Sequence, residues 1–193
     1  MIPDSEEKER ALIEALRRGD NAAKSAFYEQ FYRYLTAVCA RYVVSDEDVR
    51  DLIQEVFIKI FAKFDRYEYL GPGSLQAWCH QLTVNEALMF LRRHRRHSFL
   101  PIELFDRQDI EDDASEEPLI DDIPIPVLLE MIRKLPDRYR IVFNLYVLED
   151  KSHKEIAALL NIRESSSQSN LHRAKKILFK HINDYHKKQP YGR

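Results

Sequence analysis

A polar run in the second half of the sequence is suited to contacting DNA. The run Ser152-His153-Lys154-Glu155 begins a short apolar segment, a turn follows at Asn161, and Ser165–Asn170 then begins a longer segment. Hydroxyl and amide groups at the start of a helix bond phosphates and base edges in the major groove. This layout predicts a helix-turn-helix from Ser152 to about Lys176, with a plain helical hairpin as the alternative. Counter-charge for phosphates is supplied by Arg173, Lys175 and Lys176.

The first half combines aromatic rings with an amide and a cluster of arginines. Trp78 and Asn85 lie in one segment, which follows a loop holding Tyr67 and Tyr69 and ends in the basic run Arg92-Arg93-His94-Arg95-Arg96-His97. Aromatic faces stack on unpaired bases, and adjacent cations follow the sugar-phosphate backbone. The mixture therefore indicates contact with unpaired nucleotides. The residue types leave open that Trp78 is a core residue and that the tyrosines are loop surface.

The elements that must position these residues are helices. Glycine occurs only at positions 19, 71, 73 and 192, so the usual punctuation of β-hairpins is missing. Helical spacing of apolar residues is strongest over 49–64, behind an N-cap expected at Ser45. Further N-caps are expected at Ser74, Asp137 and Ser152, the last as a capping box with Glu155. We therefore predict an all-α fold.

Charge is segregated along the chain, although the net formal charge is only −2. Residues 92–97 and 151–188 are basic, whereas 103–122 is acidic, lacks periodicity and is interrupted by proline, as is typical of a flexible linker. The domains expected from this pattern are a helical domain at 6–97, an acidic flexible linker at 98–123 and a second helical domain at 124–188.

Composition argues against several classes of function. No glycine-rich phosphate loop, metal-ligand spacing or nucleophile-base pair is evident, so we expect no enzyme activity, no metal and no cofactor. Cys39 and Cys79 lie in apolar helical surroundings and are expected to be reduced core thiols. No stretch approaches the roughly 18 apolar residues of a membrane span, and the start of the chain is too acidic for a signal peptide. We expect a cytoplasmic protein without membrane insertion.

One helix presents a polar face, and the residue types alone do not decide what role this face has. In the segment 49–64, Asp51, Gln54 and Glu55 lie opposite the apolar stripe, and Ile58 shares their face. On residue types alone a solvated face is the favoured interpretation.

Two sets of motifs together resemble the extracytoplasmic-function (ECF) sigma factors of bacterial RNA polymerase. Asp48–Lys59 and Trp78–Arg93 resemble their sigma-two domain. Leu135–Arg140, Lys154–Ala157 and Leu171–Lys176 resemble their sigma-four domain, a helix-turn-helix. The resemblance covers about residues 10 to 97 and 125 to 183, with the linker falling where the family has one.

The resemblance implies a transcription initiation factor that binds core RNA polymerase, recognises minus-ten and minus-thirty-five promoter elements and nucleates promoter melting. The β′ clamp of the polymerase is expected to contact Asp51, Gln54, Glu55 and Ile58. The minus-ten element is expected to contact Tyr67, Tyr69, Trp78, Asn85, Arg92, Arg93, Arg95 and Arg96. The minus-thirty-five element is expected to contact Ser166, Gln168, Ser169, His172, Arg173 and Lys176. The other partners implied are the polymerase β flap and an anti-sigma factor.

The sequence departs from the family pattern at several of these positions. The family usually has arginine at the position of Gln81, an acidic or amide residue at Met89 and a basic residue at Gln168. Fewer cations in the recognition helix predict weaker attraction to phosphate. Two rivals stay open: a conventional dimeric helix-turn-helix regulator, which binds a palindromic duplex alone, and a structural interaction module, which binds no nucleic acid.

Overall fold

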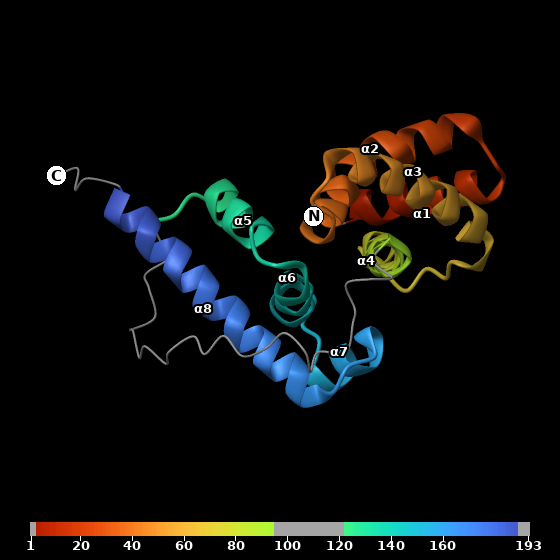
Figure 1. Ribbon diagram of the computed structural model, residues 1–193. Coiled ribbons are helices and arrows are strands. Elements are labelled where there is room, and N and C mark those ends of the chain that lie inside the picture. The colour runs from red at the N-terminus through yellow and green to blue at the C-terminus, as the bar shows by residue number, and fades with distance from the viewer. Residues whose placement is uncertain (1–2, 95–121, 189–193) are drawn as a thin grey trace. The chain divides into compact units, whose positions relative to one another are not determined.

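The computed structural model describes residues 3–94 and 122–188, and these fall into two compact units (Figure 1). Both units are helical, and the described residues contain no β-strand, which confirms the predicted all-α fold. The predicted linker, 98–123, lies almost entirely outside the described residues, as do Arg95 and Arg96 of the basic run. The exact domain limits therefore stay a prediction.

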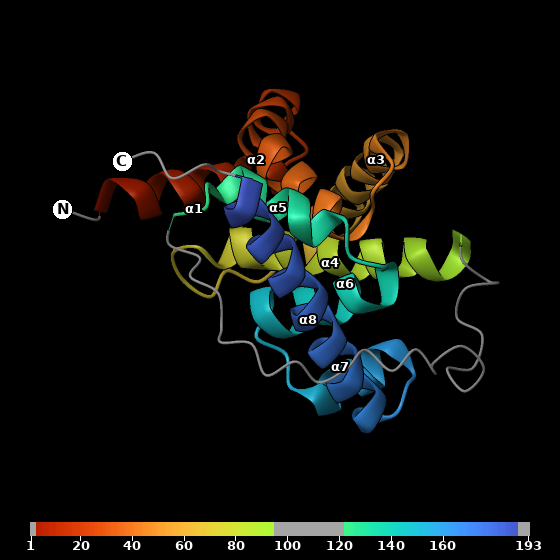
Figure 2. The ribbon, with the colours of Figure 1, turned by 60° about the vertical axis from the view of Figure 1, so that its left-hand side comes forward.

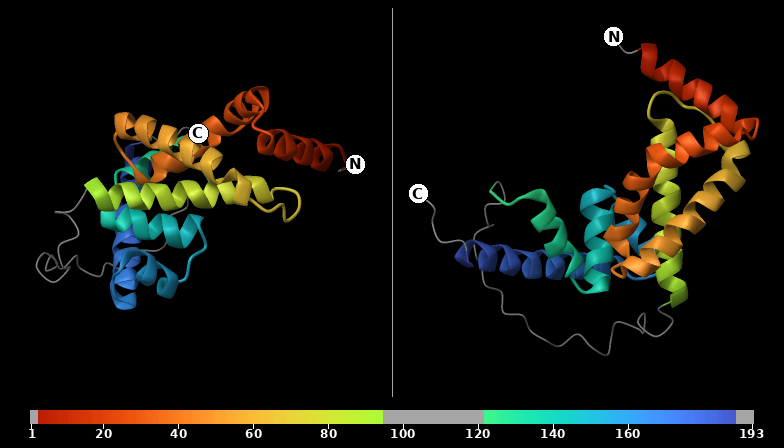
Figure 3. Two further views of the ribbon diagram at one scale, coloured as in Figure 1. Left: turned by 90° about the vertical axis from the view of Figure 1, so that its right-hand side faces the viewer. Right: turned by 90° about the horizontal axis from the view of Figure 1, so that it is seen from above.

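The first unit is a bundle of helices built around an apolar core. It consists of α1 (Pro3–Arg17), α2 (Asn21–Tyr42), α3 (Asp46–Lys63), a 3-10 turn η1 (Phe64–Arg66) and α4 (Ser74–His94). Helices α2, α3 and α4 contact one another pairwise, and α1 packs on α2 and η1. A loop, 67–73, connects η1 to α4 and is drawn in yellow at the start of that helix in Figure 3.

An aromatic cluster centred on Phe27 fills one part of this core. The ring of Phe27 is fully buried and stacks on Phe31, and it meets the edges of the rings of Phe57 and Phe64. Burying rings of this size supplies much of the apolar driving force of a small domain. The core therefore fixes α3 and the start of the 67–73 loop against α2.

The second unit carries the helix-turn-helix. Its elements are α5 (Ile125–Arg133), α6 (Asp137–Phe143), a π-helical turn η3 (Asn144–Leu148), α7 (His153–Leu160) and α8 (Glu164–Lys188). The long helix α8 contacts α5, α6 and α7, which lie along its length (Figure 2). The core comes from the apolar stripe of α8, including Leu171, Ala174, Leu178 and Ile182. Helix α8 is therefore the scaffold of this unit.

The helix ends agree with the sequence in part. Ser45 is the N-cap of α3, with its Oγ accepting the backbone N–H of Asp48, as expected. Ser74 was expected to be an N-cap but is the first residue of α4. Asp137 is likewise the first residue of α6, behind Pro136. Both N-cap expectations were wrong because each side chain bonds a partner elsewhere, Ser74 within the loop and Asp137 at Arg140.

Candidate nucleic-acid and polymerase-binding surfaces

The helix-turn-helix is held by its two helix ends. Ser152 caps α7 in a capping box, because its Oγ accepts the N–H of Glu155 and the Glu155 Oε2 accepts the N–H of Ser152 at 2.8 Å. The Ser152 hydroxyl also donates to Oε2 at 2.7 Å, and this bond together with the backbone N–H of Ser152 lowers the pKa of Glu155. Asn161 ends α7 in the left-handed region, with φ 54°, which amide side chains tolerate better than most. Both predictions are confirmed.

The first turns of α8 separate buried from exposed polar residues. Ser167 and Asn170 are buried together with Leu171 and Ala174, at helical spacing. The buried Ser167 Oγ bonds the Nδ1 of His153 at 2.9 Å, and the ring of His153 stacks on Tyr146, which ties α7 to α8. The predicted minus-thirty-five residues lie outside this stripe, with Gln168, Ser169 and His172 exposed and Ser166, Arg173 and Lys176 half-buried.

The predicted polymerase-binding residues share one face of α3. Asp51, Gln54 and Ile58 are exposed, and the side chain of Ile58 is 68% exposed although it is apolar. Their spacing of three and four residues places them on one side of the helix. Glu55 is half-buried on the same face and forms an ion pair with Arg93 of α4 at 3.1 Å. The face is therefore polar, with one exposed apolar residue, Ile58, towards its C-terminal end.

Helix α4 brings the predicted minus-ten residues to one side of the first unit. Trp78, Asn85 and Arg92 follow one another at seven-residue intervals, and Asn85, Arg92 and Arg93 are exposed. The amide oxygen of Asn85 accepts a bond from the Gln81 side chain at 3.2 Å. Trp78 is half-buried, so its ring is partly core and partly surface.

The loop 67–73 corrects the role expected for its tyrosines. Tyr67 is only 2% exposed, and its ring packs against Phe64 and Trp78. Its hydroxyl bonds the Oγ of Ser74 at 2.7 Å, and burial raises the pKa of the phenol. The ring of Tyr67 is therefore part of the core beneath the loop and is not accessible for stacking on a base.

Tyr69 is half-buried, because the guanidinium of Arg10 lies 4.2 Å above its ring. Leu70, the next residue of the loop, is apolar and has 84% of its surface exposed. Tyr67 is therefore buried, whereas Tyr69 keeps part of its surface exposed, and its contact with a base stays a prediction.

The sequence pattern did not predict the burial of two charged residues. Glu86 of α4 is 4% exposed and forms an ion pair with Lys59 of α3. In the second unit Arg140 is 1% exposed and donates to the backbone oxygens of Arg133 and Leu135 at 3.2 and 2.9 Å. Burial lowers the pKa of Arg140 to about 10. Only the packing of neighbouring elements reveals such pairs, because each residue alone resembles an ordinary surface charge.

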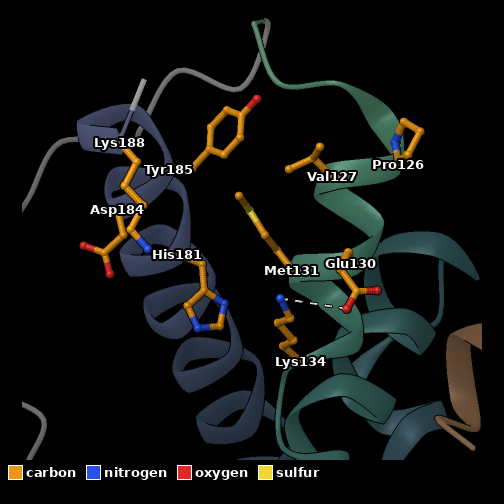
Figure 4. Close-up of a pocket in the computed structure, with 9 residues that line it drawn as sticks. All are labelled: Pro126, Val127, Glu130, Met131, Lys134, His181, Asp184, Tyr185 and Lys188. Atoms are coloured by element: carbon orange, nitrogen blue, oxygen red, sulfur yellow. Dashed lines mark ion pairs between the residues drawn. The ribbon is translucent and has the colours of Figure 1, made fainter. Parts of the chain in front are cut away.

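A groove of about 480 Å³ lies between α5 and the end of α8 in the second unit (Figure 4). Met131 and Tyr185 face each other across it, while Lys134, at its edge, pairs with Glu130 at 3.9 Å. Val127 of α5 also lines this groove. In the described part of the chain, no cluster of histidine, cysteine and acidic residues could hold a metal ion, and no helix is long and apolar enough to cross a membrane.

Comparison with known proteins identifies two family domains. Residues 27–97 match the family model "Sigma-70 region 2", and residues 126–178 match "Sigma-70, region 4". The solved structure "Structure of CnrH in complex with the cytosolic domain of CnrY" aligns with 91% of this chain and 97% of its own, at 18% identity and a TM-score of 0.47.

Curated relatives span nearly the whole chain. The "ECF RNA polymerase sigma factor SigE" of Mycolicibacterium smegmatis is 30% identical over 181 residues, which cover 91% of this chain and 68% of that protein. The "ECF RNA polymerase sigma-E factor" of Escherichia coli (strain K12) is 24% identical over 178 residues, which cover 88% and 92% respectively. With both sigma regions in family order, this chain belongs to the ECF RNA polymerase sigma factors and serves to initiate transcription.

Proposed function

We propose that this sigma factor reads a promoter at two points while it is docked on core RNA polymerase through α3. The observation that carries the proposal is the division of polar residues on α8. Ser167 and Asn170 are committed to the interior, whereas Gln168, Ser169 and His172 stand exposed at the start of the second helix of a helix-turn-helix. That position enters the major groove in proteins of this architecture.

The minus-thirty-five element is assigned to this edge of α8. Gln168 and His172 are suited to base edges, because their side chains donate and accept hydrogen bonds. The hydroxyl of Ser169 bonds the backbone oxygen of Ser165 at 2.9 Å and still has lone pairs for a further contact. Ser166, Arg173 and Lys176 are assigned to phosphates and the groove edge.

The minus-ten element is assigned to α4 and the 67–73 loop. Asn85 and the exposed part of Trp78 supply an amide and a ring edge for an unpaired base, and Arg92 and Arg93 supply charge for the strand. Within the loop, the exposed Leu70 and the half-buried Tyr69 are assigned to the flipped base. Extruding a base costs a few kcal/mol, which apolar contact offsets.

Core polymerase is assigned two contacts. The β′ clamp contacts the α3 face of Asp51, Gln54, Glu55 and Ile58, because this helix lies in the matched sigma-70 region 2, whose polymerase-docking helix these positions resemble. The β flap contacts the groove between α5 and α8, where Val127 and Met131 offer apolar area. An anti-sigma protein that covers the α3 face is a further partner that family membership leads us to expect.

Transcription initiation by this chain takes place in the cytoplasm, where polymerase meets the chromosome. It involves no covalent chemistry by this chain.

The test is run-off transcription with purified core polymerase on a library of upstream regions. We expect promoter-dependent transcripts with this chain, and we expect Ile58→Asp to abolish them together with core binding. Val44→Asp is the matched control, since Val44 is another exposed apolar residue of the same unit, at 44%. The absence both of promoter-dependent transcripts and of co-purification with core polymerase would falsify the proposal. Binding of a palindromic duplex by a dimer without polymerase would instead favour the regulator.

A further inference from the structure

Helix α1 reaches the 67–73 loop at three points. Arg17 donates from Nη2 to the backbone oxygen of Tyr67 at 2.7 Å, where the loop begins. Glu9 accepts the backbone N–H of Gly73 at 3.2 Å, where the loop ends. Between them the guanidinium of Arg10 covers the ring of Tyr69 at 4.2 Å. The loop is thus held at both ends and in the middle by one helix that precedes the matched sigma region 2.

The cation over Tyr69 is itself held in place. The Nε and Nη2 atoms of Arg10 donate to Glu6 Oε1 at 3.1 and 3.0 Å, one turn earlier on α1. Helix α1 in turn is anchored in the core by Ile13 and Leu16, which are 3% and 5% exposed. A rigidly packed helix therefore carries the groups that contact the loop.

The loop has few constraints of its own. Gly71 and Gly73 have φ of 122° and 81°, and a side chain at either position would meet no atom within 4 Å. Its internal bonds converge on Ser74, whose Oγ also accepts the N–H of Leu70 at 3.2 Å. A glycine-rich segment of this kind visits many conformations unless outside contacts select one.

We propose that α1 is a positioning element for base capture, in which Arg17 and Glu9 set the loop conformation that receives an unpaired promoter base. Neither residue touches the base. The inference rests on the proposed function, because it presupposes that the loop binds a base of the minus-ten element.

The test uses full-length protein in holoenzyme with core polymerase. The variants are Arg17→Ala and Glu9→Ala, with Arg17→Lys and Glu9→Gln as conservative versions that keep the donor and the acceptor. Arg18→Ala is the charge-matched control, an exposed neighbour at the same end of α1. Thermal unfolding followed through Trp78 fluorescence shows whether each variant is folded. Glu9→Ala is the second variant, because the contact it removes lies on the surface and its loss should not unfold the domain.

The probe is a promoter selected from the library with wild-type holoenzyme, together with copies that carry a single abasic site at each minus-ten position of the nontemplate strand. Opening is measured from the fluorescence of 2-aminopurine in the melted region, and core binding from fluorescence anisotropy. On the intact promoter we expect Arg17→Ala and Glu9→Ala to slow opening about tenfold with core affinity unchanged. The conservative variants and Arg18→Ala should open it at the wild-type rate.

The abasic promoter distinguishes a defect in positioning the loop from a general loss of promoter opening. At the position where base removal slows wild-type opening most, the alanine variants should open as fast as wild type, because no base remains to be captured. An equal slowing by Arg17→Ala on intact and abasic promoters overturns the inference while leaving base capture by the loop intact. Wild-type opening that is indifferent to every abasic site overturns the base-binding role of the loop, and this inference with it.

Discussion

In the second unit the residues proposed to contact DNA stand on one continuous helix, α8, whereas in the first unit they come from α4 and from a loop. On α8, helical periodicity places Ser167 and Gln168 on different sides of the helix, and His153 of the adjacent α7 bonds the buried Ser167. At the loop, burial of Tyr67 depends on Trp78 and on Arg17, which lie in other elements. The positions of the proposed contact residues on α8 therefore follow mainly from the geometry of one helix. The conformation of the 67–73 loop depends on contacts with other elements.

The buried charges of the two units differ in the same way. Arg140 bonds carbonyl oxygens five and seven residues away, so it closes a local turn between α5 and α6. Lys59 and Glu86 are 27 residues apart and connect α3, the proposed polymerase-binding helix, to α4, the proposed strand-binding helix. In the first unit an ion pair thus connects the two helices that carry the proposed surfaces.

Thiol labelling should give the largest effect and should report on the first unit alone. The sequence has two cysteines, Cys39 and Cys79, and burial raises the pKa of each from 9.0 to about 12. Because the thiolate is the reactive form, a disulfide reagent at pH 8 should react at least about a thousandfold more slowly than with the unfolded chain. Release of the coloured thiol product measures the rate, and labelling at the unfolded rate would contradict the fully packed core.

The same two thiols predict how the stability of the first unit depends on pH. Their folded pKa lies above the unfolded value of 9.0, so the stabilisation is complete below that pH. As the pH rises above it, the unfolded chain ionises and the folded chain does not, so stability falls. Urea unfolding at several alkaline pH values tests the sign, with Cys39→Ala/Cys79→Ala as the control that should flatten the dependence.

Arg140→Ala should destabilise the second unit and leave the first unaffected. The carbonyl oxygens of Arg133 and Leu135 lose their donor in the interior, at a cost of about 3 kcal/mol. Trp78 is the single tryptophan, so its fluorescence follows the first unit, while circular dichroism follows both. We expect an earlier transition by circular dichroism and an unchanged one by fluorescence. The control Arg138→Ala, which removes a cation 5.0 Å from the Tyr139 ring centroid, should cost less than about 1 kcal/mol.

Asn85→Ala and Gln168→Ala should separate the two proposed contacts. Each removes an amide from a base, which corresponds to about 1–3 kcal/mol of discrimination. A premelted promoter should restore transcription by Asn85→Ala, because its defect lies in strand opening, but not by Gln168→Ala. Equal rescue of both variants would show that the units do not divide the work in this way.

The Glu55–Arg93 ion pair should give the smallest effect. Both side chains are about half exposed, at 45% and 49%, so a double-mutant cycle of unfolding should give a coupling below about 1 kcal/mol. Arg93→Ala should nevertheless lower the slope of log affinity for a single strand against log salt by about 0.7. Arg50→Ala, an exposed arginine on α3, should leave that slope unchanged. A coupling of several kcal/mol would make the pair a structural bond and remove Arg93 from the strand-binding surface.

Much of the candidate site could be predicted wherever the signal is local. The cap at Ser45, the capping box at Ser152 and the left-handed turn at Asn161 depend on residues within a few positions of each other, and all are confirmed. Ser74 and Asp137 are also residue types that commonly cap helices, but their side chains bond Tyr67 and Arg140 instead. The difference arises because capping competes with other partners that only the folded chain brings within reach.

The sequence by itself determined the helices, their apolar stripes and the family, because these depend on spacing and on motifs along the chain. The tertiary structure decided which polar and aromatic residues face inward. The backbone oxygen of Tyr67 accepts a bond from an arginine 50 residues earlier, and Glu86 forms an ion pair with a lysine 27 residues earlier. Burial of such groups is stable only when a partner satisfies them, and the partner comes from another helix that local patterning does not specify.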